Sequence, residues 1–465
     1  MKAEGARRFK PYPAYKDSGV EWLGEIPAHW DVKRVKHIAR KIGSGKTPAG
    51  GGEVYVSEGI MFLRSQNIHF AGLRLDDVAF IDSKTDLEMS GSRVREGDVL
   101  LNITGASLGR TCVARLNGIA ANVNQHVCVI RPQDTVLDSA FLAASLASQS
   151  VQAQIFNTED GISRNALNFE QIGQLRVAHP GWDEQRAIAR FLDRETARID
   201  ALVVKKERLI ELLQEQRTAI ITHAVTKGLP STGSGQATSN VPLKDSGVEW
   251  LGEIPAHWEV KALKGLSRLQ TGLTLGKKYE DGTLITRPYL RVANVQDGYL
   301  DLDDVGVIDL PERNAARHEL REGDVLMTEG GDFDKLGRGY VWEGQVAHCL
   351  HQNHIFAVRP SVESLTSRFL AIAMSSGYGR AYFTATSKQS TNLASTNSTK
   401  LRNLPMPVPP VAEQRAITTF LDRETERIDA LVAKVREAID RLEELRTTLI
   451  SAAVTGKIDV RTEAA

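Results

Sequence analysis

The sequence has little cysteine, no long apolar run and no excess of charge of either sign. Its 465 residues include three cysteines, Cys112, Cys128 and Cys349, whose odd number and unmatched spacing fit neither a disulfide framework nor a metal-binding cluster. No apolar stretch approaches the roughly 18 residues that cross a membrane, and the basic first residues lack the apolar core of a secretory signal. These absences predict a protein of the reducing cytoplasm without a membrane segment.

Charge and length narrow the possibilities further. The 58 basic and 58 acidic side chains give a formal net charge of zero. That balance argues against a protein that coats nucleic acid regardless of sequence, but it leaves room for a local basic groove. A chain of this length is too long for one hydrophobic core, so we expect two to four domains.

What the sequence does contain is an internal repeat. The run KDSGVEWLGEIPAHW at 16–30 returns unchanged at 244–258. The letters EQRAI and FLDRETARIDALV within 184–203 return with one change within 413–432. The residues between these copied blocks differ strongly, so a constant frame surrounds a variable filling. Such a chain is expected to meet two identical partners while recognising two different targets.

The repeat predicts six segments along the chain. They are a leading segment (1–30), a first variable domain (31–180), a first long helix (181–228), a linker with the second copy of the leading run (229–258), a second variable domain (259–410) and a second long helix (411–465). Thr226–Leu243 is rich in Gly, Ser, Thr and Pro, which indicates a flexible connector between the halves.

Apolar residues that recur at alternating steps of three and four predict the two long helices. In the first helix they are Ile188, Leu192, Ile199, Leu202, Leu209, Leu213 and Ile220, with polar breaks at Glu195, Lys206 and Gln216. In the second they are Ile417, Leu421, Ile428, Leu431, Val435, Ala438, Leu442, Leu445 and Leu449, with a break at Glu424. This periodicity suits an antiparallel two-helix coiled coil. Glu195 and Glu424 occupy equivalent seam positions, where each either fixes the register or faces solvent.

Helix length then constrains the expected architecture. A helix of about 40 residues is roughly 60 Å long. Antiparallel pairing of two such helices from a head-to-tail repeat gives the chain pseudo-two-fold symmetry. The variable domains are then expected at opposite ends of a spacer that fixes their separation.

Several short strand-like runs occur once in each variable domain. MFLRSQNIHFAG (61–72) parallels RPYLRVANVQDG (287–298), REGDVL occurs at 95–100 and 321–326, and NQHVCVIRP (124–132) parallels QNHIFAVRP (352–360). Alternating apolar and polar residues are typical of strands. We therefore predict a mixed α+β fold that both variable domains share.

Taken in their duplicated order, these features resemble the specificity subunit of type I restriction–modification enzymes. The resemblance covers nearly the whole chain and rests on GEIPAHW, REGDVL, the strand ending in Arg-Pro, and the helix starts PGWDEQRAIARFLDRETARID and PPVAEQRAITTFLDRETERID. It implies two target-recognition domains, each of which reads one half of a bipartite, asymmetric site in the major groove of double-stranded DNA. It also implies that the conserved helices set the half-site spacing and dock two modification subunits that methylate adenine N6, with restriction and translocase subunits as further partners.

The resemblance implies a noncatalytic chain that binds no cofactor, with S-adenosylmethionine, ATP and magnesium on partner subunits. The sequence agrees, since it lacks the Asn/Asp-Pro-Pro-aromatic pocket of an adenine methyltransferase and its cofactor-binding glycines. GSGKT at 43–47 lacks the earlier glycine of a phosphate-binding loop, because that position is Arg40. A flexible turn is the favoured interpretation. We expect no catalytic or metal-binding residue, and His126 and His354 are expected to be hydrogen-bonded strand histidines.

Side-chain chemistry indicates the candidate DNA-binding residues, because base edges in the major groove are contacted by Arg, Lys, Asn and Gln. They are Lys46, Arg64, Gln66, Asn67, Arg110, Arg164 and Asn165 in the first domain, and Arg291, Asn294, Gln296, Lys388, Gln389 and Asn392 in the second. Lys46 is expected to contact a phosphate. Arg64 and Arg291 match between domains, so they are expected to hold the fold or grip phosphate. Specificity is expected where the domains differ, as in 161–167 and 387–393.

Two other functions remain open from the residues alone. One is a nuclease or methyltransferase that acts without partners, and the other is a coiled-coil adaptor that joins proteins without DNA. The copied tryptophans, Trp22, Trp30, Trp250 and Trp258, also allow two interpretations. They either pack inside the chain, which is favoured, or anchor a partner.

Overall fold

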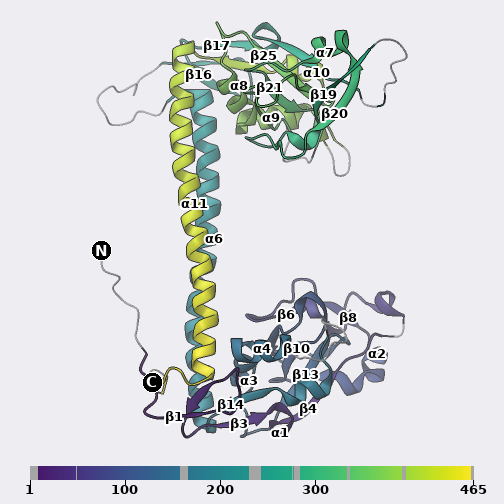
Figure 1. Ribbon diagram of the computed structural model, residues 1–465, viewed down its shortest axis with the longest axis vertical. Coiled ribbons are helices and arrows are strands. Elements are labelled where there is room, and N and C mark those ends of the chain that lie inside the picture. The colour runs from purple at the N-terminus through teal and green to yellow at the C-terminus, as the bar shows by residue number, and fades with distance from the viewer. Residues whose placement is uncertain are drawn as a thin grey trace. The chain divides into compact units, whose positions relative to one another are not determined.

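The computed structural model describes residues 9–48, 50–157, 166–229, 242–274, 276, 283–331, 336–389 and 394–461. It divides into two compact units, Met1–Glu207 with Arg436–Ala465, and Arg208–Val435 (Figure 1). The two long helices, α6 (Trp182–Lys227) and α11 (Val411–Val454), each contribute one part to each unit. Most of the predicted connector, residues 230–241, lies outside the described residues. Within the described part of the chain, no helix has the length and apolar character to cross a membrane.

The variable part of the first unit, which we call the first head (31–180), is built on two four-stranded sheets with the orders β11-β10-β13-β4 and β8-β5-β12-β9. The unit's strands are β1 (Tyr15–Asp17), β2 (Glu25–Pro27), β3 (Asp31–Arg34), β4 (Ala39–Ser44), β5 (Ile60–Leu63), β6 (Ile68–His69), β7 (Gly72–Leu73), β8 (Ala79–Ile81), β9 (Arg93–Val94), β10 (Val99–Asn102), β11 (Thr111–Val113), β12 (Ala121–Val123), β13 (Val127–Pro132) and β14 (Arg176–His179). Its shorter helices are α1 (Val35–Ile38), α2 (Ser83–Glu88), α3 (Ser139–Ala147), α4 (Gln149–Phe156) and α5 (Phe169–Gln174).

The second head (259–410) repeats this plan in the second unit, with a four-stranded sheet and a second sheet of three strands in the order β20-β19-β24. Its four-stranded sheet has the order β18-β25-β21-β23, which matches β4-β13-β10-β11 strand for strand. The unit's strands are β15 (Leu243–Asp245), β16 (Glu253–Pro255), β17 (Glu259–Ala262), β18 (Ser267–Thr271), β19 (Leu284–Leu290), β20 (Gly306–Pro311), β21 (Val325–Thr328), β22 (Gly330–Gly331), β23 (Gly339–Val341), β24 (Leu350–His351), β25 (Ile355–Pro360), β26 (Lys388–Gln389), β27 (Ala394–Ser395) and β28 (Pro405–Val408). Its helices are α7 (Glu312–His318), α8 (Ser367–Ser375), α9 (Gly377–Thr386) and α10 (Ser398–Arg402). The predicted α+β fold, shared by both heads, is confirmed.

The central strand of each head is apolar on both faces, which explains its sequence. In β13, Cys128 and Ile130 belong to one core cluster, while Val127 and Val129 belong to another. Because side chains alternate across a strand, a sheet covered on both faces needs a nearly continuous apolar run. The three cysteines of the chain are free and buried, and burial raises the pKa of each thiol to about 12. None is therefore poised as a nucleophile at neutral pH.

The two motifs that recur in both heads meet in a buried ion pair. Asp98 of the first REGDVL run is 1% exposed and accepts hydrogen bonds from Arg131 Nε and Nη2, both at 2.7 Å. Asp324 of the second run is 0% exposed and accepts from Arg359 Nε at 2.7 Å and Nη2 at 2.6 Å. Bidentate arginine–carboxylate pairs of this kind fix geometry as well as charge. REGDVL and the Arg-Pro strand recur because each supplies one partner of this pair.

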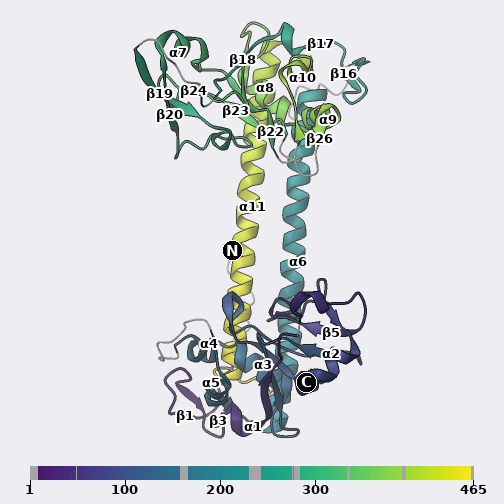
Figure 2. The ribbon, with the colours of Figure 1, turned by 90° about the vertical axis from the view of Figure 1, so that its right-hand side faces the viewer.

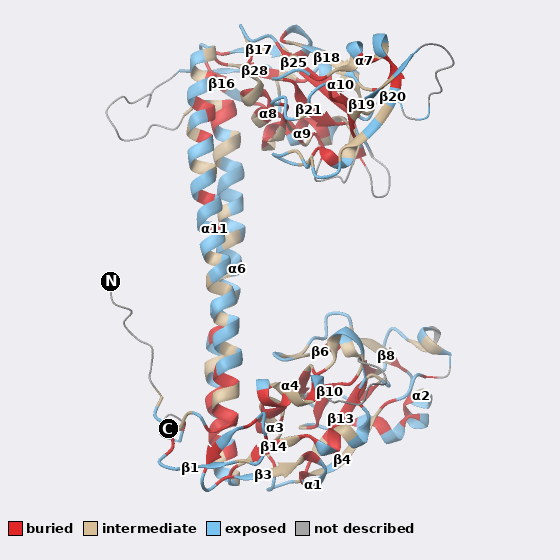
Figure 3. Ribbon diagram, in the orientation of Figure 1, coloured by how far each residue is buried: buried red, intermediate tan, exposed pale blue. Residues whose placement is uncertain are grey.

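In each unit, α6 and α11 pack antiparallel (Figures 1 and 2). In the first unit the start of α6, with Ile188 and Leu192, shares a core with Ile450 and Val454 at the end of α11. In the second unit the roles are exchanged, because the end of α6 packs with the start of α11 around Ala224, Val225, Ile417 and Leu421. Figure 3 shows the buried residues of the helices gathered in these contacts with the heads. The predicted antiparallel pairing is confirmed.

The details of the seam differ from the heptad assignment. Four leucines that it placed in the seam are exposed: Leu202 (40%), Leu209 (43%), Leu431 (41%) and Leu445 (52%). The covered residues lie one position further along, at Val203 and Ile210 on α6 and at Val432 on α11, so the assignment was wrong at these positions. Where the helices do meet, matched ion pairs cross between them: Arg446 Nε lies 3.1 Å from Asp200 Oδ1, and Arg217 Nε lies 3.6 Å from Asp429 Oδ1.

Glu195 and Glu424 take neither of the two roles that the seam pattern left open. Their side chains are 17% and 20% exposed, so they do not simply face solvent. Glu195 pairs with Arg194 and Arg198, and Glu424 pairs with Arg423 and Arg427, all on the same helix. Within the described residues, the ion pairs that cross between the helices are instead those of Asp200 and Asp429.

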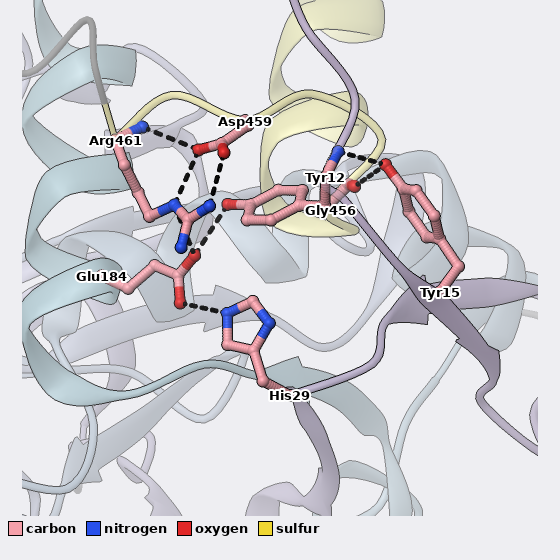
Figure 4. A network of polar contacts seen from close by, with 7 residues as sticks. All are labelled: Tyr12, Tyr15, His29, Glu184, Gly456, Asp459 and Arg461. Atoms are coloured by element: carbon pink, nitrogen blue, oxygen red, sulfur yellow. Dashed lines mark hydrogen bonds and ion pairs between the residues drawn. The ribbon is translucent and has the colours of Figure 1, made fainter.

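The two copied blocks touch each other inside each unit. In the first unit, His29 Nε2 lies 3.0 Å from Glu184 Oε2, and the Tyr12 hydroxyl donates to Glu184 Oε1 at 2.8 Å (Figure 4). Burial and the neighbouring Glu184 carboxylate raise the pKa of Tyr12. In the second unit, His257 Nε2 lies 2.8 Å from Glu413 Oε2. The constant frame is therefore one structural module, made once in each unit.

The segment after α11 completes this module in the first unit. Arg461 lies over the Tyr12 ring, 4.9 Å from its centroid, and is hydrogen-bonded to Asp459 (Figure 4). Val460 is 0% exposed and belongs to the same core as Trp30. The tail thus clamps the leading segment onto the start of α6.

Candidate nucleic-acid interface

In the first head, four loops that carry polar side chains gather at one edge of the sheets. They follow β4, β5, β10 and β12, whose ends all lie at this edge, as the strand register requires. Backbone hydrogen bonds tie them together: Gly45 N donates to Asn124 O at 3.1 Å, Asn124 N to Leu63 O at 3.1 Å, and Ile103 N to the His126 carbonyl at 3.0 Å. Loops at the edge of a rigid sheet are common positions for binding residues.

The second head builds the same loop edge. Leu273 N donates to the His351 carbonyl at 2.9 Å, Gln352 N to Leu290 O at 2.9 Å, and Glu329 N to the His354 carbonyl at 2.8 Å. A small sheet in the order β22-β27-β26 lies beside it and carries Lys388, which is exposed. The structure therefore brings the candidates that lie within the described residues of each head toward one surface.

The GSGKT run, predicted to be a flexible turn, consists of the last two residues of β4 followed by an irregular loop at this edge. A Cβ atom on Gly45 would lie 1.6 Å from the Val123 carbonyl oxygen, so only glycine fits where the loop crosses β12. Residues 45–48 have no regular secondary structure, and no helix begins there to receive a phosphate. Lys46 follows the glycine and is exposed at the edge.

Arg64 and Arg291 occupy the same loop in the two heads and hold it in the same way. Each backbone N–H donates to the side chain of an asparagine three residues on, Arg64 to Asn67 at 2.9 Å and Arg291 to Asn294 at 2.7 Å. Each guanidinium also donates to an aspartate carbonyl at 3.0 Å, that of Asp77 or Asp304. These contacts favour the fold-holding role expected for the matched arginines.

The two asparagines are occupied within the chain. Asn67 is 2% exposed and donates to the Arg74 carbonyl at 2.8 Å, and Asn294 is 3% exposed and donates to the Asp301 carbonyl at 2.8 Å. Neither amide faces solvent, and a base contact would require the loop to open. Gln66 is exposed, with Nε2 donating to Asp77 Oδ2 at 2.6 Å, and Gln296 donates to the Ala293 carbonyl at 2.7 Å.

Two arginines at this edge have side chains without a partner among the described residues. Arg110 and Arg338 follow Leu-Gly in both heads, and within the described residues neither guanidinium has a hydrogen-bond or ion-pair partner. The Nε atom of Arg338 is buried without one. The glycine before each has positive φ (82° and 79°), and a Cβ there would lie 2.5 Å from Gln152 or Phe383. The backbone that presents each arginine is therefore fixed.

Arg110 is among the residues predicted from the sequence to bind DNA, whereas Arg338 is not. The signal that could have found it is the triplet Leu-Gly-Arg, which follows REGDVL in both heads at slightly different distances. Three other candidates, Arg164, Asn165 and Asn392, lie outside the described residues, and Gln389 is placed only as part of β26.

The matched histidines connect two loops of the edge. His126 Nδ1 lies 2.6 Å from Thr104 Oγ1, and His354 Nδ1 lies 2.7 Å from Glu329 Oε2. Both are hydrogen-bonded, as expected, although they stand in the loop before the strand and not in the strand itself. In the part of the chain that is described, no group of His, Cys, Asp or Glu residues is arranged to hold a metal ion.

The four copied tryptophans separate into two pairs. Trp30 and Trp258 are 0% exposed and pack inside their units, as favoured from the sequence. Trp22 and Trp250 are 42% and 44% exposed, so internal packing does not account for them fully.

Comparison with known proteins places both halves of the chain in one family. The model described as "Type I restriction modification DNA specificity domain" matches residues 27–212 and 255–441. The specificity subunit of the type I restriction enzyme EcoKI from Escherichia coli (strain K12) is 21% identical over 94% of this chain and 90% of its own length. That of StySPI from Salmonella potsdam is 21% identical over 94% and 90%.

Solved structures show the same fold. The HsdS subunit from Thermoanaerobacter tengcongensis has a TM-score of 0.54 and 17% identity, and the match covers 93% of this chain and 98% of that one. A chain from a study of assembly and conformational transition of the type I R-M system has a TM-score of 0.61 and 17% identity, with 92% and 98% covered.

Proposed function

The chain belongs to the family of type I restriction–modification specificity subunits, and we propose that each of its two heads reads one half of a bipartite, asymmetric site in the major groove of double-stranded DNA. The observation that carries this proposal is the loop edge, which both heads build with two equivalent backbone hydrogen bonds and with matched arginine, asparagine and histidine residues. Other positions of the edge differ, such as Gln66 in the first head and Ala293 in the second. A common scaffold with a different polar surface suits two related domains that read different bases.

Contacts at the edge divide into two classes in this proposal. Arg110, Arg338 and Lys46 grip phosphates, because their cations are unpaired among the described residues and arginine and lysine supply most phosphate contacts. Base recognition belongs to the segments that differ between the heads, 161–167 and 387–393. Arg64 and Arg291 hold the loop that stands beside them.

The long helices set the distance between the half-sites in this proposal. α6 is continuous over 46 residues, which corresponds to about 70 Å. Antiparallel pairing is present in each unit, and it would carry the heads at opposite ends of a spacer. A spacer of fixed length selects half-sites at a fixed separation, as in dimeric DNA-binding proteins.

The chemistry belongs to partners. Two modification subunits carry S-adenosylmethionine and methylate adenine N6, and restriction subunits supply ATP-driven translocation and cleavage. The chain itself is the noncatalytic reader and scaffold, and it acts in the cytoplasm, where its DNA and partners are. Incubating the purified chain with DNA, magnesium and S-adenosylmethionine should give no methylation and no cleavage. Either product would favour the stand-alone enzyme.

Exchange of one head tests the proposal directly. Residues 31–180 are replaced by the corresponding head of another specificity subunit, and adenine methylation is mapped across the genome in cells that also make the modification subunit. We expect one half-site to change and the other to stay. The reciprocal exchange of residues 259–410 is the matched control and should change the opposite half. Changes in both halves after a single exchange would refute independent heads.

The spacer role has its own test. Inserting four residues after Glu207 lengthens α6 by about one turn, roughly 6 Å. The methylated motif should then change its half-site spacing, or assembly should fail because the two helices no longer match. An unchanged motif with full activity would exclude the spacer role. A chain that binds modification subunits but no DNA of any sequence would favour the coiled-coil adaptor.

A further inference from the structure

The copied hairpin of each unit presents a tryptophan outward. In the first unit, Val20 and Leu23 of the turn between β1 and β2 are buried, whereas Trp22 between them is 42% exposed. In the second unit, Leu251 is 5% exposed and Trp250 beside it is 44% exposed. The two copies therefore place the same aromatic side chain at the same point of the turn and to the same extent in solvent.

The backbone of the turn fixes that position. Asp17 Oδ1 accepts a hydrogen bond from Gly19 N at 2.9 Å, and Asp245 Oδ1 accepts one from Gly247 N at 3.0 Å. Both glycines have positive φ, 67° and 71°, which favours glycine there. An aromatic side chain held by a rigid turn loses little conformational entropy when it is covered by a partner.

Folding alone does not explain why the copies are identical. Of the fifteen residues in the copied run, nine are exposed in both units. Four of these nine have roles in folding, namely Asp17, Gly19, Gly24 and His29. The other five, which include Glu21, Trp22 and Glu25, have no such role among the described residues. Substitutions at such surface positions usually change stability by no more than about 0.5 kcal/mol, and the heads differ freely over most of their length. Identity at exposed positions therefore indicates that the two copied surfaces bind the same partner.

The charges around Trp22 and Trp250 indicate the class of partner. Glu21 and Glu25 flank Trp22, and both carboxylates are exposed without a hydrogen-bond or ion-pair partner among the described residues; Glu249 and Glu253 repeat this arrangement. A lysine also lies beside each turn, because Lys457 Nζ donates to the Glu25 carbonyl at 2.7 Å and Lys227 Nζ donates to the Glu253 carbonyl. Unpaired carboxylates repel the phosphates of DNA, so an exposed tryptophan with such carboxylates and a lysine around it suits a protein partner with an apolar pocket and charged residues at its edge.

We propose that Trp22 and Trp250 are anchors for two copies of one partner protein, one copy on each unit. This inference rests on the proposed function, under which that partner is the modification subunit. Tryptophan is enriched among the residues that dominate binding energy, and truncating such an anchor lowers affinity by roughly 30-fold or more. The surface for one copy consists of Glu21, Trp22 and Glu25, and that for the other of Glu249, Trp250 and Glu253.

The test uses the full chain and the modification subunit encoded with it, and counts bound copies by native mass spectrometry while affinity is titrated by sedimentation. The wild-type chain should bind two copies. Trp22→Ala and Trp250→Ala should each retain one tight site and weaken the other by roughly 30-fold, and the double variant should lose both tight sites. Val307→Ala and Val362→Ala alter exposed apolar residues elsewhere (72% and 77% exposed) and should bind two copies normally.

A second pair of variants guards against misfolding. Glu21→Lys and Glu249→Lys reverse an exposed charge without removing packed atoms, and each should weaken one site while the melting temperature stays at the wild-type value. Two copies bound with wild-type affinity by the double tryptophan variant and by the double lysine variant would overturn the anchor. Loss of DNA binding by the tryptophan variants without any modification subunit present would also overturn it, because the surface would then face DNA.

The outcomes separate the anchor from the function on which it rests. If the wild-type chain binds no modification subunit at all, the proposed function fails. If it binds two copies and the variants do the same, the proposed function stands and the anchor is wrong.

Discussion

Removing the buried carboxylate of one head should lower the stability of that head and leave the stability of the other head unchanged. Asp98 is 1% exposed and accepts two hydrogen bonds from Arg131 and one from the backbone N–H of Arg95. The change Asp98→Asn keeps the size of the side chain but removes its charge. The hydrogen bond to Asp98 raises the pKa of Arg131, so the guanidinium stays charged and loses its counterion.

The expected magnitude follows from the burial of the pair. Breaking a buried ion pair by removing one partner costs about 3–5 kcal/mol. Because the Arg131 side chain is 18% exposed and water can partly solvate it, we expect the lower end of that range, about 3 kcal/mol. A loss of that size raises the population of the opened head by roughly 100-fold. The reading loops rest on the same sheet, so the half-site read by the first head should be lost as well.

Hydrogen exchange followed by mass spectrometry measures the stability of each head separately. Amides of β10 and β13 should exchange roughly 100-fold faster in Asp98→Asn, while those of β21 and β25 keep their protection. Asp324→Asn is the matched control and should reverse the pattern. The double change Asp98→Leu with Arg131→Met should recover much of the protection, because an apolar pair of similar volume avoids the unpaired charge. Equal softening of both heads by one change, or none by either, would refute the reasoning.

Three further predictions concern the second head, the loop edge and the tail. Burial lowers the pKa of His351 to about 4, below its unfolded value near 6.5, so protons favour the unfolded state. The free energy of unfolding of the second head should therefore fall by roughly 3 kcal/mol as the pH falls from 6.5 to 4. Hydrogen-exchange measurements on the His351→Gln variant should lack this pH dependence. Arg110→Ala and Arg338→Ala should each weaken binding to all DNA sequences alike and reduce the salt slope by about one; a change in the preferred bases instead would contradict a phosphate contact. Removing the segment after Thr455 uncovers the core around Val460 and should destabilise the first unit by roughly 2 kcal/mol or more. Hydrogen exchange should become faster in β1 and β2 only. Unchanged exchange in these strands would show that the tail does not hold the leading segment in place.

The sequence was a sufficient guide wherever a pattern reports burial. The letter-for-letter repeat predicted two similar units, the runs VCVIRP and IFAVRP predicted strands, and the apolar periodicity predicted the paired helices. The same periodicity misplaced Leu202 and Leu445, because their neighbours Val203 and Arg446 are the residues that the partner helix covers. Where apolar residues stand side by side, as at 202–204, the sequence does not say which of them faces the partner helix. Glu195 sits at a seam position by count, but its neighbours Arg194 and Arg198 satisfy it locally.

The residues of the candidate site were harder to predict from the sequence, for a different physical reason. Side-chain type selects Asn67 and Arg110 equally as candidates for DNA binding. Only the fold reveals that the Asn67 amide is buried and occupied by backbone carbonyls, whereas the Arg110 guanidinium is unpaired among the described residues. Arg338 was missed because the loop between REGDVL and Leu-Gly-Arg is longer in the second head, which hides the match until the strands are superposed in register.

The role of the long helices as a fixed spacer is tested most directly by DNA-binding affinity measured as a function of half-site separation. Once methylation mapping has given the motif, the purified chain is titrated with duplexes in which the spacer between the two half-sites is lengthened or shortened one base pair at a time. Two heads held by paired helices predict a sharp affinity maximum at one spacer length and much weaker binding to either half-site alone. Affinity that is independent of spacer length, or equal for a single half-site, would contradict it.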